Sequence, residues 1–216
     1  MAEHSPAART VPARPRITVK WAQTLDGRAA AADGTSQWIT GPEARADVHR
    51  RRALADAILV GTGTLIADDP ALTARAPSGE LLVSAAEQPV PVIVGSRPIP
   101  EAARVRSHPA LGADTPEPIR LAGTDLTAEL AGLAALGIRS VFVEGGPAIV
   151  SSLLRAGLVD ELLVYVAPAL LGGPRLAVGN IGADSMVDIQ RLNFASTQQL
   201  GNDILFIATP APKEAP

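Results

Sequence analysis

The stretch Val141-Phe-Val-Glu-Gly-Gly-Pro-Ala148 joins a strand directly to a helix. Its apolar start is typical of a buried strand, and the helix that follows is predicted to run to about Ala156. A second apolar run, Ala57–Val60, is also ended by glycine, in Val60-Gly-Thr-Gly-Thr64. Short buried strands of this kind, separated by helices, are typical of α/β proteins.

The remaining predicted elements continue this alternation. We predict strands over residues 17–22, 90–94, 140–143 and 161–166, and helices over residues 41–54 and 126–136. Within Thr40-Gly-Pro-Glu43, a threonine and a glutamate three residues later form a capping-box pattern for the first helix. Residues 194–200 and 203–208, joined through Gly201-Asn202, predict a hairpin. The expected fold is therefore α/β, with a mostly parallel mixed sheet flanked by helices and a C-terminal antiparallel hairpin.

The two ends of the chain differ from its centre. Residues 1–15 and 210–216 are rich in proline and alanine and show no apolar period, so we predict disordered tails there. The remaining residues, 16–209, have a length that suits one domain with a sizeable core.

Composition excludes several functions. The chain has 19 Lys and Arg against 22 Asp and Glu, which argues against a nucleic-acid or membrane-surface partner. It has no cysteine, so disulfides, thiol nucleophiles and zinc-thiolate sites are excluded. The sequence contains no run of about 18 apolar residues, so no transmembrane helix is predicted. Residues 1–15 lack the apolar core of a signal peptide, which predicts a cytoplasmic location. The three histidines have no ligand-spaced partner, so no metal site is expected.

Both glycine-rich turns follow strands that are predicted to end at the same edge of the sheet, where ligands bind in parallel α/β folds. Backbone N–H groups and the positive end of the helix after Gly145-Gly146 could hold a phosphate or pyrophosphate there. A tight turn without a ligand is an equally good interpretation of the first motif alone, and the lone G-x-G of the second turn is weak evidence for a ligand. The spacing is neither that of a P-loop nor G-x-G-x-x-G. Two such turns together favour a dinucleotide site.

Other candidate residues lie in loops and on one helix. Ala67-Asp-Asp-Pro-Ala-Leu-Thr-Ala-Arg75 predicts a turn whose aspartates are solvated or bind ribose hydroxyls, and whose arginine could hold a phosphate. Arg45, His49 and Arg52 share one helix face, which is more often simply exposed to solvent. Trp38 lies in a polar loop, where it could anchor the loop or line a flat ligand.

Several motifs occur in a fixed order along the chain. They are Lys20-Trp-Ala-Gln-Thr-Leu-Asp-Gly-Arg28, Gly34-Thr-Ser-Gln-Trp-Ile-Thr40, the 67–75 segment, Val143-Glu-Gly-Gly-Pro147, Ala156-Gly-Leu-Val-Asp-Glu161, Val166-Ala-Pro168 and Leu171-Gly-Gly173. Together they closely resemble the reductase domain of the bifunctional riboflavin-biosynthesis deaminase–reductase, over nearly all of residues 16–209. The resemblance implies a dihydrofolate-reductase-like fold, NADPH as hydride donor and a homodimer. It also implies reduction of the ribose of 5-amino-6-(5-phosphoribosylamino)uracil to the ribityl form.

The resemblance also implies the site residues, with the glycine-rich turns added from the pattern above. The candidate catalytic residues are Lys20, Asp68 and Glu144. The candidate cofactor-binding residues are Ala22, Trp38, Gly61, Thr64, Asp68, Ser96, Gly145, Gly146, Pro147 and Ala148, with the phosphate-binding turn and helix reaching Ser152. The candidate substrate-binding residues are Ser36, Arg52, Leu72, Arg75 and Glu144. Opening the ribosylamine to an imine and reducing it at C1′ needs acid–base help near the sugar.

Two departures from the family pattern bear on function. The deaminase half of the family needs a zinc site with cysteines, so this chain, which has none, is predicted to be a free-standing reductase. Gly95 stands where the family often has an aspartate before the serine, and the following Arg97 is a candidate ligand for the 2′-phosphate of NADPH.

Two alternatives to the leading hypothesis remain open. One is a related NADPH-dependent reductase acting on another small imine or pterin-like substrate. The other is a non-catalytic nucleotide-binding module. Ser36, Arg52 and Arg75 favour a phosphoribosyl substrate, while the three candidate catalytic residues favour an enzyme.

Overall fold

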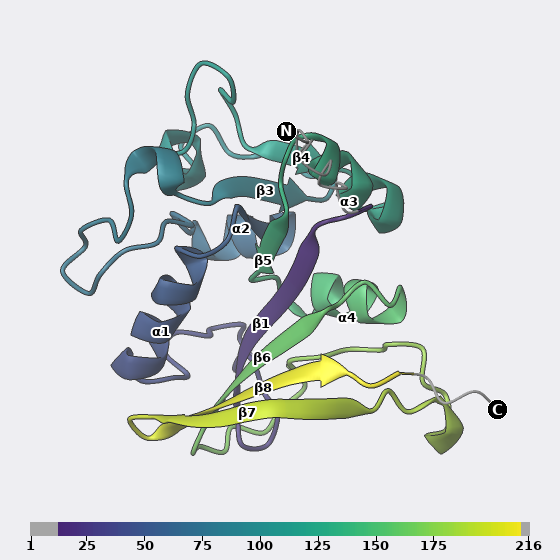
Figure 1. Ribbon diagram of the computed structural model, residues 1–216. Coiled ribbons are helices and arrows are strands. Elements are labelled where there is room, and N and C mark those ends of the chain that lie inside the picture. Colours follow the sequence, from purple (N-terminus) through teal and green to yellow (C-terminus); the bar gives the residue numbers. More distant parts are fainter. Residues whose placement is uncertain (1–12, 213–216) are drawn as a thin grey trace, which may run out of the picture.

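Eight strands form one sheet in the computed structural model, which describes residues 13–212 (Figure 1). Across the sheet the order is β4-β3-β2-β5-β1-β6-β8-β7. The strands are β1 (Arg16–Thr24), β2 (Ala57–Gly61), β3 (Val90–Val94), β4 (Ile119–Leu121), β5 (Ser140–Val143), β6 (Glu161–Ala167), β7 (Leu192–Leu200) and β8 (Asp203–Pro210). The strands from β4 to β6 are parallel, whereas β8 is antiparallel to β6 and β7 to β8. The predicted α/β class, mostly parallel sheet and C-terminal hairpin are confirmed.

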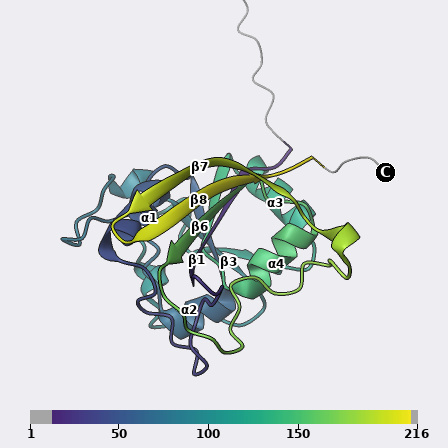
Figure 2. The same ribbon diagram turned by 90° about the horizontal axis from the view of Figure 1, so that it is seen from below.

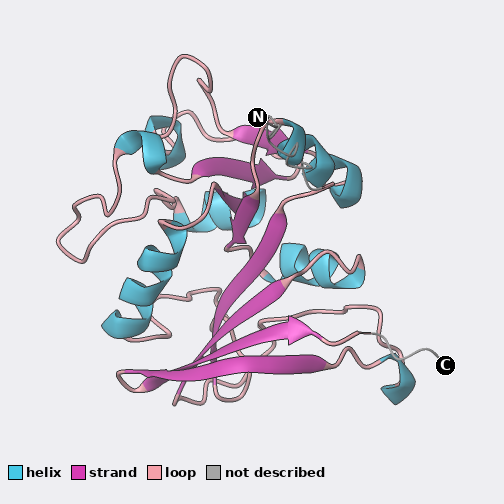
Figure 3. Ribbon diagram, viewed as in Figure 1, coloured by secondary structure: helices cyan, strands magenta, loops and turns pink. Residues whose placement is uncertain are grey.

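Helices cover both faces of the sheet (Figures 1 and 2). They are α1 (Pro42–Arg52), α2 (Thr62–Asp68), α3 (Leu126–Ala135) and α4 (Pro147–Arg155). Three short 3₁₀ helices span Ala85–Glu87, Arg104–Ser107 and Met186–Asp188. Viewed from below, α3 and α4 lie on one side of the sheet and α1 on the other (Figure 2). Figure 3 shows that residues 69–89 and 168–191 are mainly long connections.

The middle strands are buried on both faces, which explains their continuous apolar sequence. In β2, Ala57 and Leu59 belong to the apolar cluster that includes α3 and α4. The alternate residues Ile58 and Val60 pack with Leu65 of α2 in a second cluster on the other face. All of the strands predicted from such runs are present, with ends shifted by at most two residues.

Three features of the fold differ from the prediction. Helix α2 was not predicted because Gly61-Thr-Gly-Thr64, poor in helix-forming residues, was interpreted as a turn. Strand β4 was not predicted because it is only three residues long, too short to show an alternation of apolar and polar residues. The capping box at Thr40 is wrong, since the helix cap is Gly41 and has no side-chain cap. Instead, the Gly41 N–H donates to the carboxylate of Asp203 on β8 at 2.6 Å, a contact that no local pattern could reveal.

The predicted tails, residues 1–15 and 210–216, lie largely outside the described residues. Inside them, Arg14 pairs with Asp160 at 2.6 Å and the Ala211 N–H donates to the Arg191 carbonyl, so the fold extends slightly beyond residues 16–209. Within residues 13–212, no helix has the length and apolar character needed to cross a membrane.

Candidate active site

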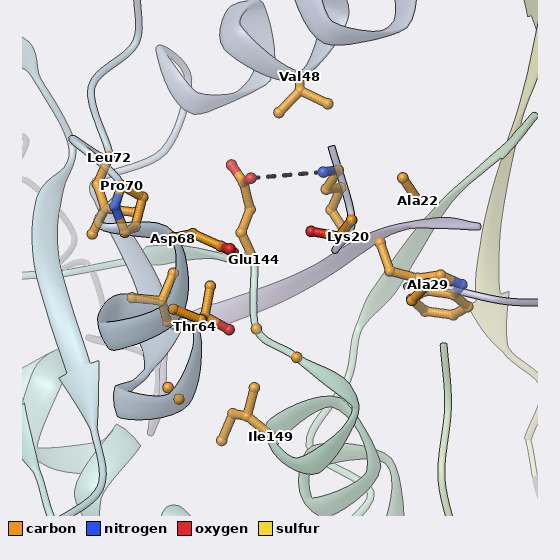
Figure 4. A pocket seen from close by; sticks show the side chains of 18 of the residues that line it. Lys20, Ala22, Ala29, Val48, Thr64, Asp68, Pro70, Leu72, Glu144 and Ile149 are labelled. Carbon is orange, nitrogen blue, oxygen red and sulfur yellow. Dashed lines mark ion pairs between the residues drawn. The ribbon is translucent and has the colours of Figure 1, made fainter. Parts of the chain in front are cut away.

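A cavity of about 1320 Å³ lies at the carboxyl ends of β2, β3 and β5, beside the second half of β1. Helix α1 borders one side, and the starts of α2 and α4 border another (Figure 4). Its volume exceeds the range of about 300–1000 Å³ that is usual for one drug-sized ligand, so it can hold two ligands side by side. The cavity lies at the sheet edge where the sequence predicted a ligand.

Three charged side chains meet in this cavity: Lys20, Arg52 and Glu144. Lys20 Nζ lies 3.7 Å from Glu144 Oε2. The Arg52 guanidinium donates to both carboxylate oxygens of Glu144, at 2.5 and 2.9 Å, and its third nitrogen donates to the Thr73 carbonyl at 3.0 Å. Such a bidentate pair fixes the carboxylate plane as well as its charge.

The sheet register brings Lys20 and Glu144 together. Val19 of β1 pairs with Val143 of β5, so the next residues, Lys20 and Glu144, project from the same face of neighbouring parallel strands. The Glu144 N–H also donates to the Leu59 carbonyl at 2.9 Å, which extends the ladder between β5 and β2. In Figure 4 the Glu144 carboxylate points towards Lys20 and towards α1, which carries Val48.

Burial and neighbouring charges set the ionisation of this group. Burial alone would raise the pKa of Glu144, but the positive charges of Arg52 and Lys20 outweigh it and hold the pKa at about 2. For Lys20, burial lowers the pKa, Glu144 opposes this change and Arg52 adds to it, with a net lowering. Glu144 is therefore a fixed anion at neutral pH, and Lys20 is an ammonium group that loses its proton more readily than a solvated lysine.

His49 lies one turn before Arg52 on α1 and holds the loop that carries Arg75. Its Nδ1 lies 3.2 Å from the Arg75 backbone nitrogen and 3.2 Å from the Thr73 carbonyl oxygen, so it accepts the Arg75 N–H in one tautomer and donates to Thr73 in the other. Burial, with the charges of Arg52 and Arg75, lowers the pKa of His49 to about 4. The sequence analysis assigned His49 no function, and its position on the same helix face as Arg45 and Arg52 was the only signal.

The pKa of His49 leads to a pH prediction. In the unfolded chain His49 takes up a proton near its ordinary pKa of 6.5, whereas in the folded protein it does so only near 4. The unfolded state then binds more protons between these values, so the contribution of neutral His49 to stability is lost as the pH falls from about 6.5 to about 4. His108, whose pKa burial also lowers, contributes in the same direction. We expect an NMR titration midpoint near pH 4 for His49, and a weaker acid dependence of urea unfolding in His49→Asn. A midpoint near 6.5 would contradict the neutral, buried ring.

The glycine-rich turns line the side of the cavity opposite α1. Gly146 is the N-cap of α4 and no side chain caps the helix, so its first N–H groups are open to the cavity. A Cβ at Gly145 would lie 1.7 Å from Cγ2 of Ile149, so only glycine allows this close turn. A Cβ at Gly146 would lie 3.4 Å from Oγ1 of Thr64 on α2, which shows how closely the starts of the two helices approach. This open helix start fits the phosphates of a dinucleotide.

Most of the sequence-predicted site residues line this one cavity. They are Lys20, Ala22, Ser36, Trp38, Arg52, Gly61, Thr64, Asp68, Leu72, Arg75, Glu144, Gly145, Gly146, Pro147 and Ala148. Ser96 is exposed and is not part of the cavity wall, whereas its neighbours Gly95 and Arg97 are. Trp38 is 71% exposed, with the Arg45 guanidinium 4.6 Å from its ring centre.

Two of the sequence interpretations differ in detail from the structure. The segment of residues 67–75 was predicted as a turn, but Asp68 ends α2, and desolvation raises the pKa of its carboxyl group. The pattern alone favoured a solvent-exposed face of α1 with Arg45, His49 and Arg52, whereas the resemblance implied a substrate contact for Arg52. All three residues line the cavity.

Sequence reasoning missed further residues of the cavity wall. They include Arg104, Gly123, Leu126 and the segments 29–30 and 175–177. Residues 29–30 directly follow the first motif and residues 175–177 lie just after Leu171-Gly-Gly173, whereas Arg104, Gly123 and Leu126 lie in segments without a motif. No local pattern marked any of these positions as part of a site. Among residues 13–212, no cluster of three or more histidine or carboxylate side chains could hold a metal ion.

Comparisons with known proteins fit this geometry. The family model of the RibD C-terminal domain matches residues 15–206. The chain is 48% identical over 194 residues to the riboflavin biosynthesis protein RibD of Mycobacterium tuberculosis (strain H37Rv), covering 88% of this chain and 53% of that protein. It therefore spans about half the length of the curated relatives it matches.

Solved structures extend the comparison to the fold. A diaminohydroxyphosphoribosylaminopyrimidine deaminase/5-amino-6-(5-phosphoribosylamino)uracil reductase from Thermotoga maritima superposes with a TM-score of 0.74 and 28% identity, over 92% of this chain and 57% of that chain. A dihydrofolate reductase from Enterococcus faecalis complexed with NADP(H) superposes with a TM-score of 0.54 and 11% identity, over 91% and 97% of the two chains. The second match shows the fold alone, and it confirms the predicted dihydrofolate-reductase-like architecture.

Proposed function

The chain belongs to the RibD C-terminal domain family, and from this premise we propose that it reduces the ribose of 5-amino-6-(5-phosphoribosylamino)uracil to the ribityl form with NADPH. The observation that carries the proposal is the buried group of Lys20, Glu144 and Arg52 in a cavity that also exposes an open helix start. One part of this cavity suits acid–base chemistry at a sugar, and the other suits a dinucleotide.

The family and the fold imply a nicotinamide cofactor, and the residues present fit one. We assign the pyrophosphate to Gly145, Gly146 and the first turn of α4. The Arg97 side chain lies over Gly63, where a Cβ would come within 3.1 Å of its guanidinium, and it is our candidate for selecting NADPH through the 2′-phosphate. Bound NADPH would supply the hydride.

The protein's own residues then handle the substrate and one proton. The ribosylamine opens at the ring oxygen to give an imine, and hydride addition at C1′ with one proton at nitrogen gives the ribitylamine. Lys20 is the proton donor in this scheme, because burial lowers its pKa while Glu144 stays ionised. Glu144 and Arg52 position the ammonium group, and Asp68 remains a candidate polarising group at the cavity wall.

A direct assay tests the proposal. Purified protein is mixed with NADPH and the deaminated phosphoribosylaminopyrimidine, and absorbance at the nicotinamide band is followed. We expect oxidation of one NADPH per substrate molecule. Binding of NADPH without oxidation would favour a different small imine or pterin-like substrate, or a non-catalytic module. Failure to bind any nicotinamide cofactor would contradict the proposal.

Arg75→Ala should separate substrate binding from cofactor binding. Arg75 lines the cavity and its Nη1 donates to the Thr73 hydroxyl at 3.1 Å, so its remaining donors can reach a substrate phosphate. Loss of a charge-assisted contact raises the substrate KM on the order of tenfold to 100-fold and leaves the KM for NADPH within about twofold. The matched control is Arg50→Ala, which removes a more exposed arginine of α1 that pairs with Asp47. Equal rises in both KM values would place the phosphate elsewhere.

We also propose a homodimer that works in the cytoplasm. Support for the dimer comes from exposed apolar side chains on the C-terminal hairpin, where Phe194 is 69% exposed and stacks on Phe206 with ring centres 5.5 Å apart. Support for the location comes from the substrate, since a phosphate monoester does not cross a bilayer unaided. Light scattering coupled to size-exclusion chromatography and cell fractionation check the two statements.

A further inference from the structure

Arg104 lines the same cavity as Arg75, although it comes from a different part of the chain. It begins the 3₁₀ helix Arg104–Ser107, and its backbone N–H donates to Oδ1 of Asp69 at 2.9 Å. Asp69 is the C-cap of α2 and has a left-handed backbone with φ of 40°. The carboxylate therefore ties the start of this 3₁₀ helix to the end of α2, at the cavity wall.

Three arginines gather on this side of the cavity, but only one has a carboxylate partner. Arg52 is paired with Glu144. Within residues 13–212, neither Arg75 nor Arg104 has a carboxylate oxygen within 4.0 Å. Burial first, and then the charges of Arg52 and Arg104, lower the pKa of Arg75. Two guanidinium groups that lack a counterion and act on one another through their charge make this a site for an anion.

We propose that Arg104 binds the phosphate monoester of the substrate together with Arg75, and that Asp69 positions Arg104. This inference rests on the proposed function and names a specificity residue for it. A phosphate monoester carries a charge of about −1.5 to −2 at pH 7 and three acceptor oxygens, which two guanidinium forks can share.

The position of this pair favours the phosphate of the substrate over those of the cofactor. Leu72, three residues before Arg75, lies on a different side of Glu144 from Ile149 of α4 (Figure 4). We place the arginine pair on the Leu72 side of Glu144, apart from the open N–H groups at the start of α4. The charge of Arg52 acts on Arg75, and Arg52 pairs with Glu144 beside Lys20. A phosphoribosyl group anchored at the arginines can place its sugar at Lys20.

The main experiment measures binding of ribose 5-phosphate by NMR titration, alongside steady-state kinetics with the pyrimidine substrate. Arg104→Gln should weaken the binding of ribose 5-phosphate on the order of tenfold and raise the substrate KM by a similar factor. The kcat and the dissociation constant for NADPH should stay within about twofold. Arg104→Lys, which keeps the charge but loses the fork, should lie between Arg104→Gln and the wild type. The matched control is Arg139→Gln, an exposed arginine at the start of β5 that pairs with Asp56.

The role of Asp69 is tested separately. Asp69→Gly keeps the left-handed backbone accessible and removes only the carboxylate, so folding is retained. It should raise the substrate KM less than Arg104→Gln does, without changing kcat. In the double variant with Arg104→Gln the loss should equal that of Arg104→Gln alone, because Asp69 acts through Arg104. Additive losses would show that Asp69 does not act through Arg104.

Each remaining outcome decides one statement. An Arg104→Gln variant that folds, by its thermal transition, and binds ribose 5-phosphate as the wild type does would overturn the role of Arg104 and leave the proposed function intact. A variant that weakens the binding of NADPH instead would also overturn the role of Arg104. The same holds if the wild type does not bind ribose 5-phosphate. Binding of ribose 5-phosphate that depends on Arg104, without NADPH oxidation in the presence of the pyrimidine, would remove the proposed function and keep the phosphate site.

Discussion

Replacing Lys20 by methionine is expected to lower kcat by on the order of 100-fold to 10,000-fold, the range that general acid catalysis contributes. Methionine has a similar length but no proton to give. Glu144 keeps its bidentate partner Arg52, so the cavity retains a paired carboxylate. Binding of NADPH should be nearly unchanged, because Lys20 lies beside Glu144 and away from the start of α4 (Figure 4). Single-turnover oxidation of NADPH and fluorescence titration of the cofactor measure the two quantities.

A second variant, Lys20→Arg, distinguishes the positive charge of Lys20 from its ability to donate a proton. It preserves the positive charge beside Glu144, but a guanidinium has a pKa above about 12 and does not release a proton at neutral pH. We therefore expect Lys20→Arg to be nearly as slow as Lys20→Met. Full activity in Lys20→Arg would show that the residue supplies charge only, and the proton would then have to come from another group.

Glu144→Gln is expected to cost about 3–5 kcal/mol of the free energy of unfolding at pH 7, as measured by urea denaturation. Glutamine keeps an acceptor oxygen but leaves Lys20 and Arg52 as two cations with side chains only 17% and 13% exposed. The matched control is Glu161→Gln, which removes a partly exposed ion pair with Arg16 and should cost no more than about 1 kcal/mol. Equal stability losses in the two variants would contradict the importance of the buried charge.

The stability lost in Glu144→Gln is also expected to depend on pH. The folded pKa of Glu144, about 2, lies below its ordinary value of 4.5, so its contribution is fully present above about pH 4.5 and is lost as the pH falls towards 2. The difference in stability between the wild type and Glu144→Gln should therefore shrink over that interval. A difference that stays constant down to pH 2 would mean that the charge of Glu144 does not stabilise the fold.

Much of the fold was predictable because the middle strands are buried on both faces. Runs such as Val90–Val94 and Ser140–Val143 match β3 and β5 residue for residue. Helix α2 was not predictable, since its stability comes from packing Leu65 against β2 and β3 and not from the propensity of Thr62-Gly-Thr64. The order of the strands was equally inaccessible to local patterns.

In the candidate site, too, some features could be predicted from the local sequence and others depend on the three-dimensional fold. The glycine turn before α4 carries its own local signal, whereas the contact between Lys20 and Glu144 depends on β1 lying next to β5, which are more than 100 residues apart in the chain. The role of His49 depends on a loop 26 residues away that folds back onto α1. Arg104 comes from a segment without any motif, so only the three-dimensional structure places it beside Arg75.

The central place of β1 has a consequence for the rate of folding. β1 pairs with β5 on one side and β6 on the other, so its ladders join residues more than 120 positions apart. During synthesis β1 is made well before β5 and β6, and it gains its second neighbour only after Ala167 has been made. Contacts of such long range close slowly, and an unpaired strand can meet other chains in the interval. The Lys20–Glu144 pair forms only once β5 has paired with β1, and we expect the protein's yield in cells to depend on chaperones that shield nascent chains.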